Sequence, residues 1–270
     1  MNDIILKVER LYAGYGKSII LNDINFSICK GEILAIIGKS GCGKTTLLKN
    51  ILGLVPYQKG SIKIFDTEVS DRDLVNKRKI QKRMGVLFQR GALLNSLSVG
   101  ENVGLPLEMY TNKNPDEIRK IVKEKLGMVG LAFSYKKYPR HLSGGMIKRA
   151  ALARAIAMEP EILLCDEPSA GLDPVTTKNL DKLLLDLKTK FNITVVIVTH
   201  DILSIERIAD RIIMLDHQKI VYDGSAKDAK VSHVEPLRNF FLLGEDRDIP
   251  FKKQEIITKE FEETIYLDRD

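Results

Sequence analysis

The glycine-rich segment Gly38-Lys39-Ser40-Gly41-Cys42-Gly43-Lys44-Thr45 constrains the fold of this chain more than any other part of the sequence. It follows Glu32–Ile37, an apolar run of strand length, and leads into Lys44–Gly53, whose apolar residues recur at helical spacing. A strand, a glycine loop and a helix in this order form a phosphate-binding loop, because backbone N–H groups at the helix N-terminus attract an anion. The sequence therefore predicts an α/β protein that binds a phosphorylated ligand.

Two side chains at the end of this loop supply further chemistry. Lys44 would place its charge on the β- and γ-phosphates of a nucleotide, and the Thr45 hydroxyl would ligate Mg²⁺. The alternative is a glycine turn before an ordinary helix, but it gives no reason for Lys44-Thr45 directly behind the glycines. The expected nucleotide-binding residues of the loop are Gly38, Lys39, Ser40, Gly41, Cys42, Gly43, Lys44, Thr45 and Thr46.

Apolar runs and helical patterns alternate along the core of the chain. Ile162–Cys165 and Ile193–Val198 are almost continuously apolar, as strands of a parallel sheet are when both of their faces are buried. Between them, Asp173-Pro174 starts a helical pattern that continues to Lys190. This alternation predicts an α/β core.

Two carboxylates follow the predicted strand Ile162–Cys165. Beside a phosphate loop, Asp166 would hold Mg²⁺ through water, and Glu167 would orient or deprotonate an attacking water molecule. A carboxylate pair behind a strand is often a solvated turn, and the pair alone leaves that alternative open.

A second phosphate-seeking segment is Leu142-Ser143-Gly144-Gly145, which opens a helix that continues into the apolar-periodic run Ala150–Met158. A serine and two glycines at a helix start leave several backbone N–H groups unpaired at the positive end of the helix dipole. An ordinary Ser-capped helix is the alternative for this segment alone. The pair of phosphate-seeking helix N-termini resembles the nucleotide-binding subunit of ABC transporters, whose signature is Leu-Ser-Gly-Gly.

The resemblance implies a P-loop NTPase core with an antiparallel β subdomain and a helical signature subdomain, and it implies ATP and Mg²⁺ as cofactors. Gln89 would sense the metal and the γ-phosphate, and His200 would contact the γ-phosphate. Tyr15 matches the aromatic residue that stacks on adenine, although Tyr12, or a core role for either tyrosine, stays open. The implied catalytic residues are Glu167, His200 and Gln89, and the implied metal ligands are Thr45, Gln89 and Asp166.

In the family, the signature helix of a second copy covers the open face of the nucleotide. The resemblance thus implies a head-to-tail homodimer with two ATP molecules in the interface. Ser143, Gly144 and Gly145 would act in trans, and Asp173, in the loop behind Glu167, would contact the opposing subunit.

The predicted domain organisation is one ATPase domain over residues 1–244 with an inserted lobe. Ile4–Leu11 and Ile19–Ile28 are predicted strands with the turn Gly14-Tyr15-Gly16 between them. The alternation of strands and helices then breaks over residues 91–158, which we expect to form the helical lobe. In this lobe, Pro115–Gly127 is a predicted helix that is capped by Asn114.

Residues 245–270 are predicted to be a separate C-terminal tail. Ile257, Phe261 and Ile265 recur there at helical spacing, so the tail would contact a neighbouring subunit in the dimer. Its charge leaves a disordered tail as the alternative.

Composition limits the cellular setting. The longest apolar runs, Ile33–Ile37 and Val195–Val198, are strand-sized, whereas a membrane span needs about 20 apolar residues. Met1–Arg10 lacks the pattern of a signal peptide. Three cysteines without metal-like spacing argue against a disulfide framework and fit a reducing cytosol. The net charge of +6 would suit an anionic membrane surface or nucleic acid, or it serves solubility alone.

Details around the signature resemble the ATPases of Mla/Mce-type systems, which move phospholipids between bacterial membranes. Met146 replaces the glutamine that most family members carry after Leu-Ser-Gly-Gly, and Gly85–Leu93 and Val99–Leu107 also match. This resemblance implies an integral-membrane permease, an Mce-type lipid-binding partner, and a peripheral location on the cytoplasmic side of the bacterial inner membrane. Ser169–Asp173 departs from the subfamily and follows the general ABC form.

Two other functions stay open. The first is a transporter motor for another cargo, such as an amino acid, a drug or a metal complex, since no residue here is expected to touch the transported molecule. The second is a soluble ABC ATPase that acts on DNA or ribosomes. That class usually carries tandem cassettes or long coiled-coil insertions, and this sequence has neither. It also lacks a basic run with interleaved aromatics, so no nucleic-acid partner is expected.

Overall fold

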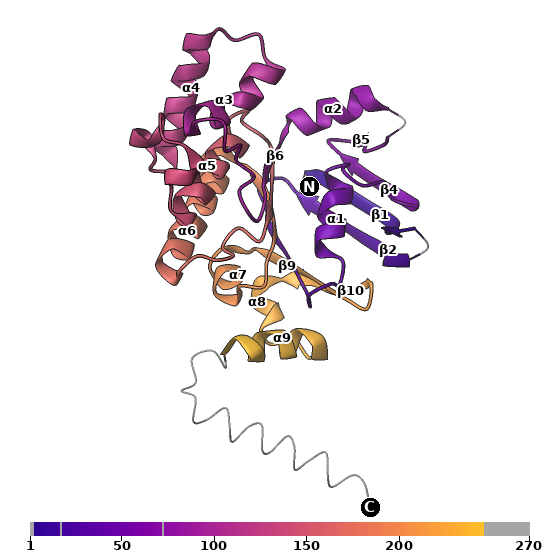
Figure 1. The fold of residues 1–270 in the computed structure, drawn as a ribbon. Helices are drawn as coiled ribbons and strands as arrows, with labels where there is room; N and C mark the ends of the chain where they lie inside the picture. Colours follow the sequence, from indigo (N-terminus) through magenta and orange to yellow (C-terminus); the bar gives the residue numbers. More distant parts are fainter. Residues whose placement is uncertain (1–2, 17, 72, 246–270) are drawn as a thin grey trace, which may run out of the picture.

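The computed structural model describes residues 3–16, 18–71 and 73–245. Over these residues the strands form two sheets, which lie beside each other in Figure 1. The smaller sheet is antiparallel, with the strand order β2 (Ser18–Cys29), β1 (Ile4–Tyr15), β4 (Lys59–Ile64) and β5 (Thr67–Glu68). The larger sheet has the order β10 (Lys219–Ser225), β9 (Arg211–Asp216), β3 (Ile33–Ile37), β8 (Thr194–Val198), β7 (Ile162–Asp166) and β6 (Met84–Leu87). All its strands are parallel except β10, which confirms the predicted α/β class with an antiparallel β subdomain.

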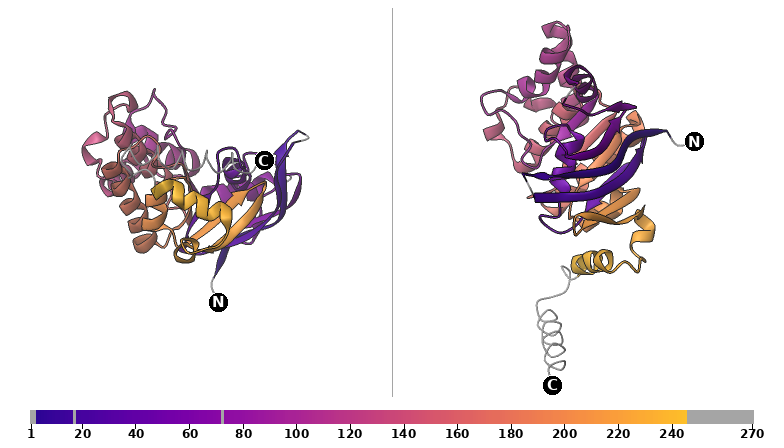
Figure 2. Two further views of the ribbon diagram at one scale, coloured as in Figure 1. Left: turned by 90° about the horizontal axis from the view of Figure 1, so that it is seen from below. Right: turned by 90° about the vertical axis from the view of Figure 1, so that its right-hand side faces the viewer.

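Helices cover both faces of the larger sheet (Figures 1 and 2). On one face, α1 (Lys44–Ile51) lies between the two sheets; the loop behind β5 leads to α2 (Leu74–Lys82). The opposite face carries α3 (Val99–Tyr110), α4 (Pro115–Met128), α5 (Gly144–Ala155) and α6 (Pro174–Phe191). The remaining helices are α7 (Ile202–Ile208), α8 (Ala226–Ala229) and α9 (Glu235–Glu245), with short 3₁₀ turns η1 (Ala132–Ser134) and η2 (Pro139–His141).

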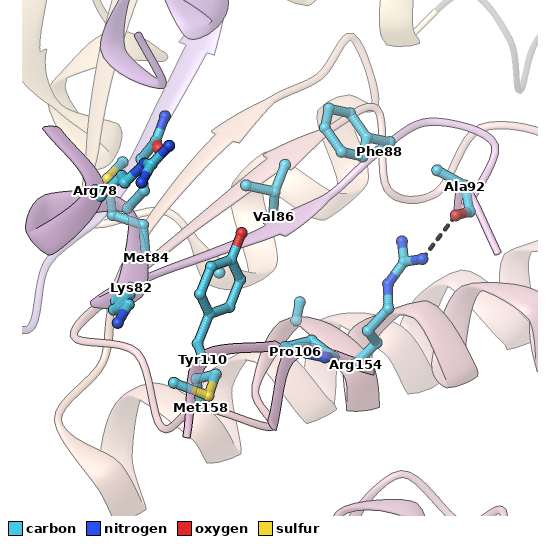
Figure 3. A pocket seen from close by; sticks show the side chains of 13 residues that line it. Arg78, Lys82, Met84, Val86, Phe88, Ala92, Pro106, Tyr110, Arg154 and Met158 are labelled. Carbon is cyan, nitrogen blue, oxygen red and sulfur yellow. Dashed lines mark hydrogen bonds between the residues drawn. The ribbon is translucent and has the colours of Figure 1, made fainter. Parts of the chain in front are cut away.

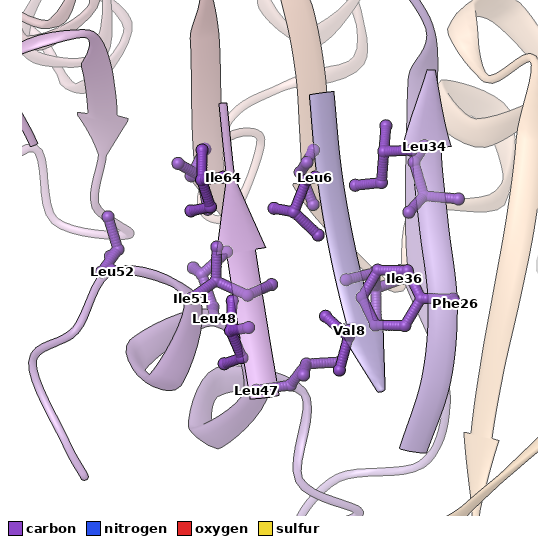
Figure 4. Close-up of a cluster of buried hydrophobic side chains, with 14 of the residues drawn as sticks. Leu6, Val8, Phe26, Leu34, Ile36, Leu47, Leu48, Ile51, Leu52 and Ile64 are labelled. Carbon is purple, nitrogen blue, oxygen red and sulfur yellow. The ribbon is translucent and has the colours of Figure 1, made fainter. Parts of the chain in front are cut away.

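The alternation of side chains along β3 divides the core between these two faces. Leu34 and Ile36 pack with Leu47, Leu48 and Ile51 of α1 and with the antiparallel sheet, as Figure 4 shows. Ile33 belongs instead to a second cluster, which includes the alanine-rich middle of α5. Since every residue of β3 is buried, the strand that carries the glycine loop is fixed from both sides.

The predicted turn Gly14-Tyr15-Gly16 is confirmed for Gly16 and wrong for Gly14 and Tyr15, because β1 continues through Tyr15. Gly14 pairs with Ile19 and Tyr15 pairs with Ser18, so the chain reverses only after Tyr15. The glycine at position 14 has a packing reason, since an added Cβ would lie 1.9 Å from the Ser18 carbonyl oxygen. Close approach of two strands, and not a turn, accounts for this residue.

The helical lobe contains α3, α4 and α5, all within the predicted range 91–158. Asn114 caps α4 as predicted, and its side chain accepts hydrogen bonds from the backbone N–H groups of Asp116 and Glu117. The signature helix differs from the prediction, since α5 ends at Ala155 and Met158 lies beyond it. The domain boundary at residue 244 stays a prediction.

The predicted tail contact of Ile257, Phe261 and Ile265 lies outside the described residues. In the part of the chain that the structure describes, no helix combines the length and the apolar character that crossing a membrane requires.

Gly85 in β6 gives a test of the contact between the larger sheet and the helical lobe. An added Cβ would lie 2.4 Å from the Ala155 carbonyl oxygen and 3.0 Å from Pro160, so Gly85→Ala should lower the free energy of unfolding by about 1–3 kcal/mol. The matched control is Gly127→Ala in α4, where an added Cβ meets nothing within 4 Å. The control should be neutral or stabilising by up to about 1 kcal/mol, since alanine favours a helix. Urea denaturation measures both, and equal stability of the two variants would contradict this packing.

Candidate functional site

The predicted phosphate-binding and catalytic residues gather where the parallel strands of the larger sheet end. Gly38 directly follows β3, Glu167 follows β7, and Gln89 and His200 each come two residues after β6 and β8. These four strands are neighbours in the order β3-β8-β7-β6, so their carboxyl ends meet along one edge. Ligands of open α/β sheets bind in this position.

The glycine loop wraps closely around the end of β3. Gly38 has a φ of 145°, and an added Cβ would lie 2.2 Å from the Leu215 carbonyl oxygen. Gly43, with a φ of 107°, caps α1 without a side-chain hydrogen bond. The Lys44 ammonium donates to the carbonyl oxygens of Gly38 at 2.8 Å and Lys39 at 3.0 Å, which holds its charge over the loop. The loop therefore presents a fixed cation and the N-terminus of α1 to an anion.

Thr45 and Asp166, two of the predicted Mg²⁺ ligands, are close enough for the Thr45 hydroxyl to lower the pKa of the Asp166 carboxyl group. Burial raises the pKa of Asp166 and the adjacent Glu167 carboxylate raises it further, while Lys49, Lys44 and the Thr45 hydroxyl lower it. A nearby cation would relieve this cost, so the pair fits Mg²⁺. In the described parts of the chain, no cluster of three His, Cys, Asp or Glu side chains could hold a metal. The ion would therefore also rely on hydroxyl and phosphate oxygens.

Glu167 and His200 are in direct contact. Nδ1 of His200 lies 2.9 Å from both carboxylate oxygens of Glu167, and it hydrogen-bonds to Oε1. The Glu167 side chain is 15% exposed, whereas that of His200 is 56% exposed. Oε2 of Glu167 is buried and makes no hydrogen bond besides its close approach to His200, so it has acceptor capacity left for a water molecule. The contact can orient the carboxylate toward a ligand on the phosphate loop.

Gln89 has an exposed side chain, but its backbone is tied to the rest of the site. Its carbonyl oxygen accepts a hydrogen bond from the ammonium of Lys148 on α5. The same ammonium donates to the Glu167 carbonyl oxygen at 3.2 Å. The prediction did not include Lys148. A signal for it exists in the sequence, because Lys148 lies three and four residues before Ala151 and Leu152 on the buried face of the helix.

The four residues predicted to act in trans lie together at the start of α5 and α6. The Ser143 side chain caps α5 by accepting from Met146 N–H at 3.3 Å, and Asp173 caps α6. An added Cβ at Gly145 would lie 2.6 Å from Thr176 of α6, and one at Gly144 would lie 3.9 Å from Leu172. Both helices belong to the face of the larger sheet opposite α1. These residues therefore form a separate cluster, in which Gly145 is half-buried and the other three are exposed, and their role in a second copy stays a prediction.

Tyr15 lies at the end of β1 and is 49% exposed. The β1–β2 hairpin runs beside the glycine loop, since an added Cβ at Gly43 would lie 2.9 Å from Ile20. Tyr12 faces a different partner, because the Lys59 ammonium lies 5.4 Å from its ring centroid. Of the two tyrosines, Tyr15 is the more exposed, and its stacking on a base stays a prediction.

Comparison with protein families agrees with this geometry. The family model described as "ABC transporter" matches residues 21–170 of the chain. A methionine import ATP-binding protein, MetN, from Clostridium tetani is 44% identical over 214 residues, which are 79% of this chain and 67% of that protein. A probable ribonucleotide transport ATP-binding protein, mkl, from Mycobacterium tuberculosis is 40% identical over 239 residues, which are 88% of this chain and 66% of that protein.

A solved structure is also similar. The ATP-binding cassette MJ0796, in a dimeric post-hydrolysis state bound to ADP and Pi, has a TM-score of 0.75 and 33% sequence identity. The match covers 82% of this chain and 99% of that chain. The similarity therefore extends over nearly the whole of that cassette.

Proposed function

The chain belongs to the ABC transporter family and hydrolyses ATP, and we propose that it powers the import of a small solute through a membrane permease. The single observation that carries its ATPase chemistry is the contact of Glu167 with His200 at 2.9 Å, on the strand edge that also holds the glycine loop. The import direction rests on the name of the methionine import relative.

The site residues divide the proposed reaction among them. The glycine loop and Lys44 bind the β- and γ-phosphates, and Thr45 and Asp166, with Gln89, hold the Mg²⁺ of the nucleotide. The metal, when bound, withdraws charge from the phosphate oxygens. Glu167 orients or deprotonates the attacking water. His200 holds the Glu167 carboxylate in place, and His200 also contacts the γ-phosphate.

The open face of the nucleotide requires a second copy in this proposal. The cluster of Ser143, Gly144, Gly145 and Asp173 would cover ATP on the partner subunit's glycine loop, and the partner would do the same in return. The dimeric state of the similar cassette MJ0796 supports this arrangement.

A groove next to Gln89 is suited to a permease segment (Figure 3). It has a volume of about 410 Å³ and lies between β6 and α2 on one side and α3 and α5 on the other. Its apolar lining residues are Met84, Val86, Phe88, Ala92, Pro106, Tyr110, Ala155 and Met158. Three cations, Arg78, Lys82 and Arg154, line it with no acidic residue, so it favours a short amphipathic helix with an acidic end.

The cargo of the proposed importer is an amino acid or another small polar molecule, because relatives named for methionine and ribonucleotide transport cover most of the chain. Phospholipid transport with an Mce-type lipid-binding partner is the second candidate. It rests on Met146 in the signature and on the likeness of Gly85–Leu93 and Val99–Leu107 to that subfamily. Either cargo places the chain under a permease on the cytoplasmic side of the bacterial inner membrane.

Glu167→Gln tests the catalytic assignment. The variant should bind ATP as the wild type does, since the glycine loop is unchanged, and its turnover should fall roughly 10²–10⁴-fold because the amide is not a base. Nucleotide binding and phosphate release, measured on the same preparation, separate the two effects. Turnover at the wild-type rate would remove Glu167 from the catalytic role.

Tyr110→Asp tests the groove as the permease contact. Tyr110 is 48% exposed and lines the groove, whereas Phe133 is 98% exposed on η1 and does not line it. We expect Tyr110→Asp to weaken permease binding at least about tenfold, as loss of a buried aromatic anchor does, and Phe133→Asp to leave it unchanged. Recovery of the permease with the tagged chain measures both, and the reverse order of the two variants would exclude this groove.

Co-purification identifies the cargo. The chain with its native permease, extracted in detergent, should bring down a solute-binding protein specific for an amino acid or a similar molecule. Stable recovery of an Mce-type protein with bound phospholipid would instead establish the second candidate and refute the first.

A further inference from the structure

Lys148 is a buried cation that none of the roles above uses. It is 5% exposed, on the first turns of α5, and its ammonium donates to two backbone carbonyl oxygens. One belongs to Gln89 after β6 and the other, at 3.2 Å, to Glu167 after β7. A single side chain of the helical lobe thus joins the ends of two strands that carry predicted catalytic residues.

The burial of this ammonium is costly. Among the ion pairs of the described residues, none includes Lys148, whereas the other buried lysine of the lobe, Lys125, bonds Glu159 at 2.9 Å and Glu124 at 3.2 Å. Burial lowers the pKa of Lys148, and the nearby Cys165, Glu167 and Asp166 act in the opposite direction. An apolar side chain would fill this place without the desolvation cost, so packing alone does not explain a lysine here.

The backbone that Lys148 bonds at Glu167 has an unusual conformation. Its φ of 46° lies in the left-handed region, which a residue with a Cβ atom occupies only when its surroundings enforce it. The Glu167 N–H donates to the Val198 carbonyl oxygen of β8 at 2.8 Å. The Glu167 carbonyl oxygen accepts from Lys148 and, at 3.2 Å, from Ala170 N–H. Lys148 thus bonds this strained peptide from the helical lobe.

We propose that Lys148 is a positioning residue, which holds the Glu167 and Gln89 backbones to α5 and so makes the catalytic carboxylate depend on the position of the helical lobe. This inference rests on the proposed function, in which Glu167 activates water. The same helix begins at Ser143–Gly145, the cluster proposed to cover ATP in a second copy. A shift of α5 when that ATP binds would therefore move the anchor of Glu167 in its own site.

Lys148→Met, which keeps the length of the side chain and removes its donors, tests the proposal against Lys125→Met. For Lys148→Met we expect kcat to fall roughly 10- to 100-fold, as for loss of charged hydrogen bonds, with KM for ATP within about threefold of the wild type. Lys148→Gln, which keeps one N–H donor group, should recover part of kcat. Lys125→Met should keep kcat although it also loses a buried cation. If Lys148→Met does not fold, Lys148→Gln against Lys125→Gln repeats the comparison.

A double-mutant cycle with Glu167→Gln shows whether Lys148 acts through Glu167. If it does, adding Lys148→Met to Glu167→Gln should lower kcat by less than about threefold further, because the carboxylate is already absent. Independent, multiplicative losses would overturn the proposal, as would a loss of kcat in Lys125→Met that equals that of Lys148→Met. If Glu167→Gln alone keeps wild-type turnover, the catalytic assignment of Glu167 fails. If Glu167→Gln loses turnover but Lys148→Met keeps it, only the positioning role of Lys148 fails.

Discussion

The register of the parallel strands is the constraint on which the site depends. Val198 of β8 pairs with Ile36 of β3 on one side and with Asp166 of β7 on the other, so these strands end at one level. The backbone bonds of the sheet therefore place the glycine loop, the carboxylate pair and His200 together before any side chain contributes. A slip of one residue in β7 would exchange the faces of its side chains and move Asp166 away from Thr45.

The features of the site that cost free energy are concentrated at these strand ends. Glu167 has a left-handed backbone, Asp166 has a pKa raised by burial, and Lys148 is buried without a carboxylate partner among the residues that the structure describes. Such features persist only where the surrounding structure fixes them. Here β3 and β8 are fully buried between apolar clusters, so the core keeps the strand ends at the site rigid.

Local patterns in the sequence were sufficient for the glycine loop, for the apolar strands and for the Asn114 cap, because each depends on neighbouring residues alone. The roles of Gln89, His200 and the signature came from resemblance, since nothing local distinguishes a glutamine or a histidine at a strand end. Gly14 was misread as a turn, because its true constraint is the Ser18 carbonyl across the hairpin. Lys148 was missed for another reason: helical spacing indicates that it is buried, but both of the carbonyl oxygens that it bonds are distant in sequence.

Helix α5 brings together the three surfaces that a transport motor must coordinate. Its first residues form the cluster proposed for a second copy, Lys148 contacts the chain's own Glu167 segment, for which we propose the catalytic role, and its end lines the groove proposed for the permease. Arg154 adds to this link by donating to the carbonyl oxygens of Gly91 and Ala92, just behind Gln89. The segment that joins the core to the lobe is therefore held by one helix at two points. Because a helix moves as a rigid rod, a displacement at any one of these surfaces must appear at the other two.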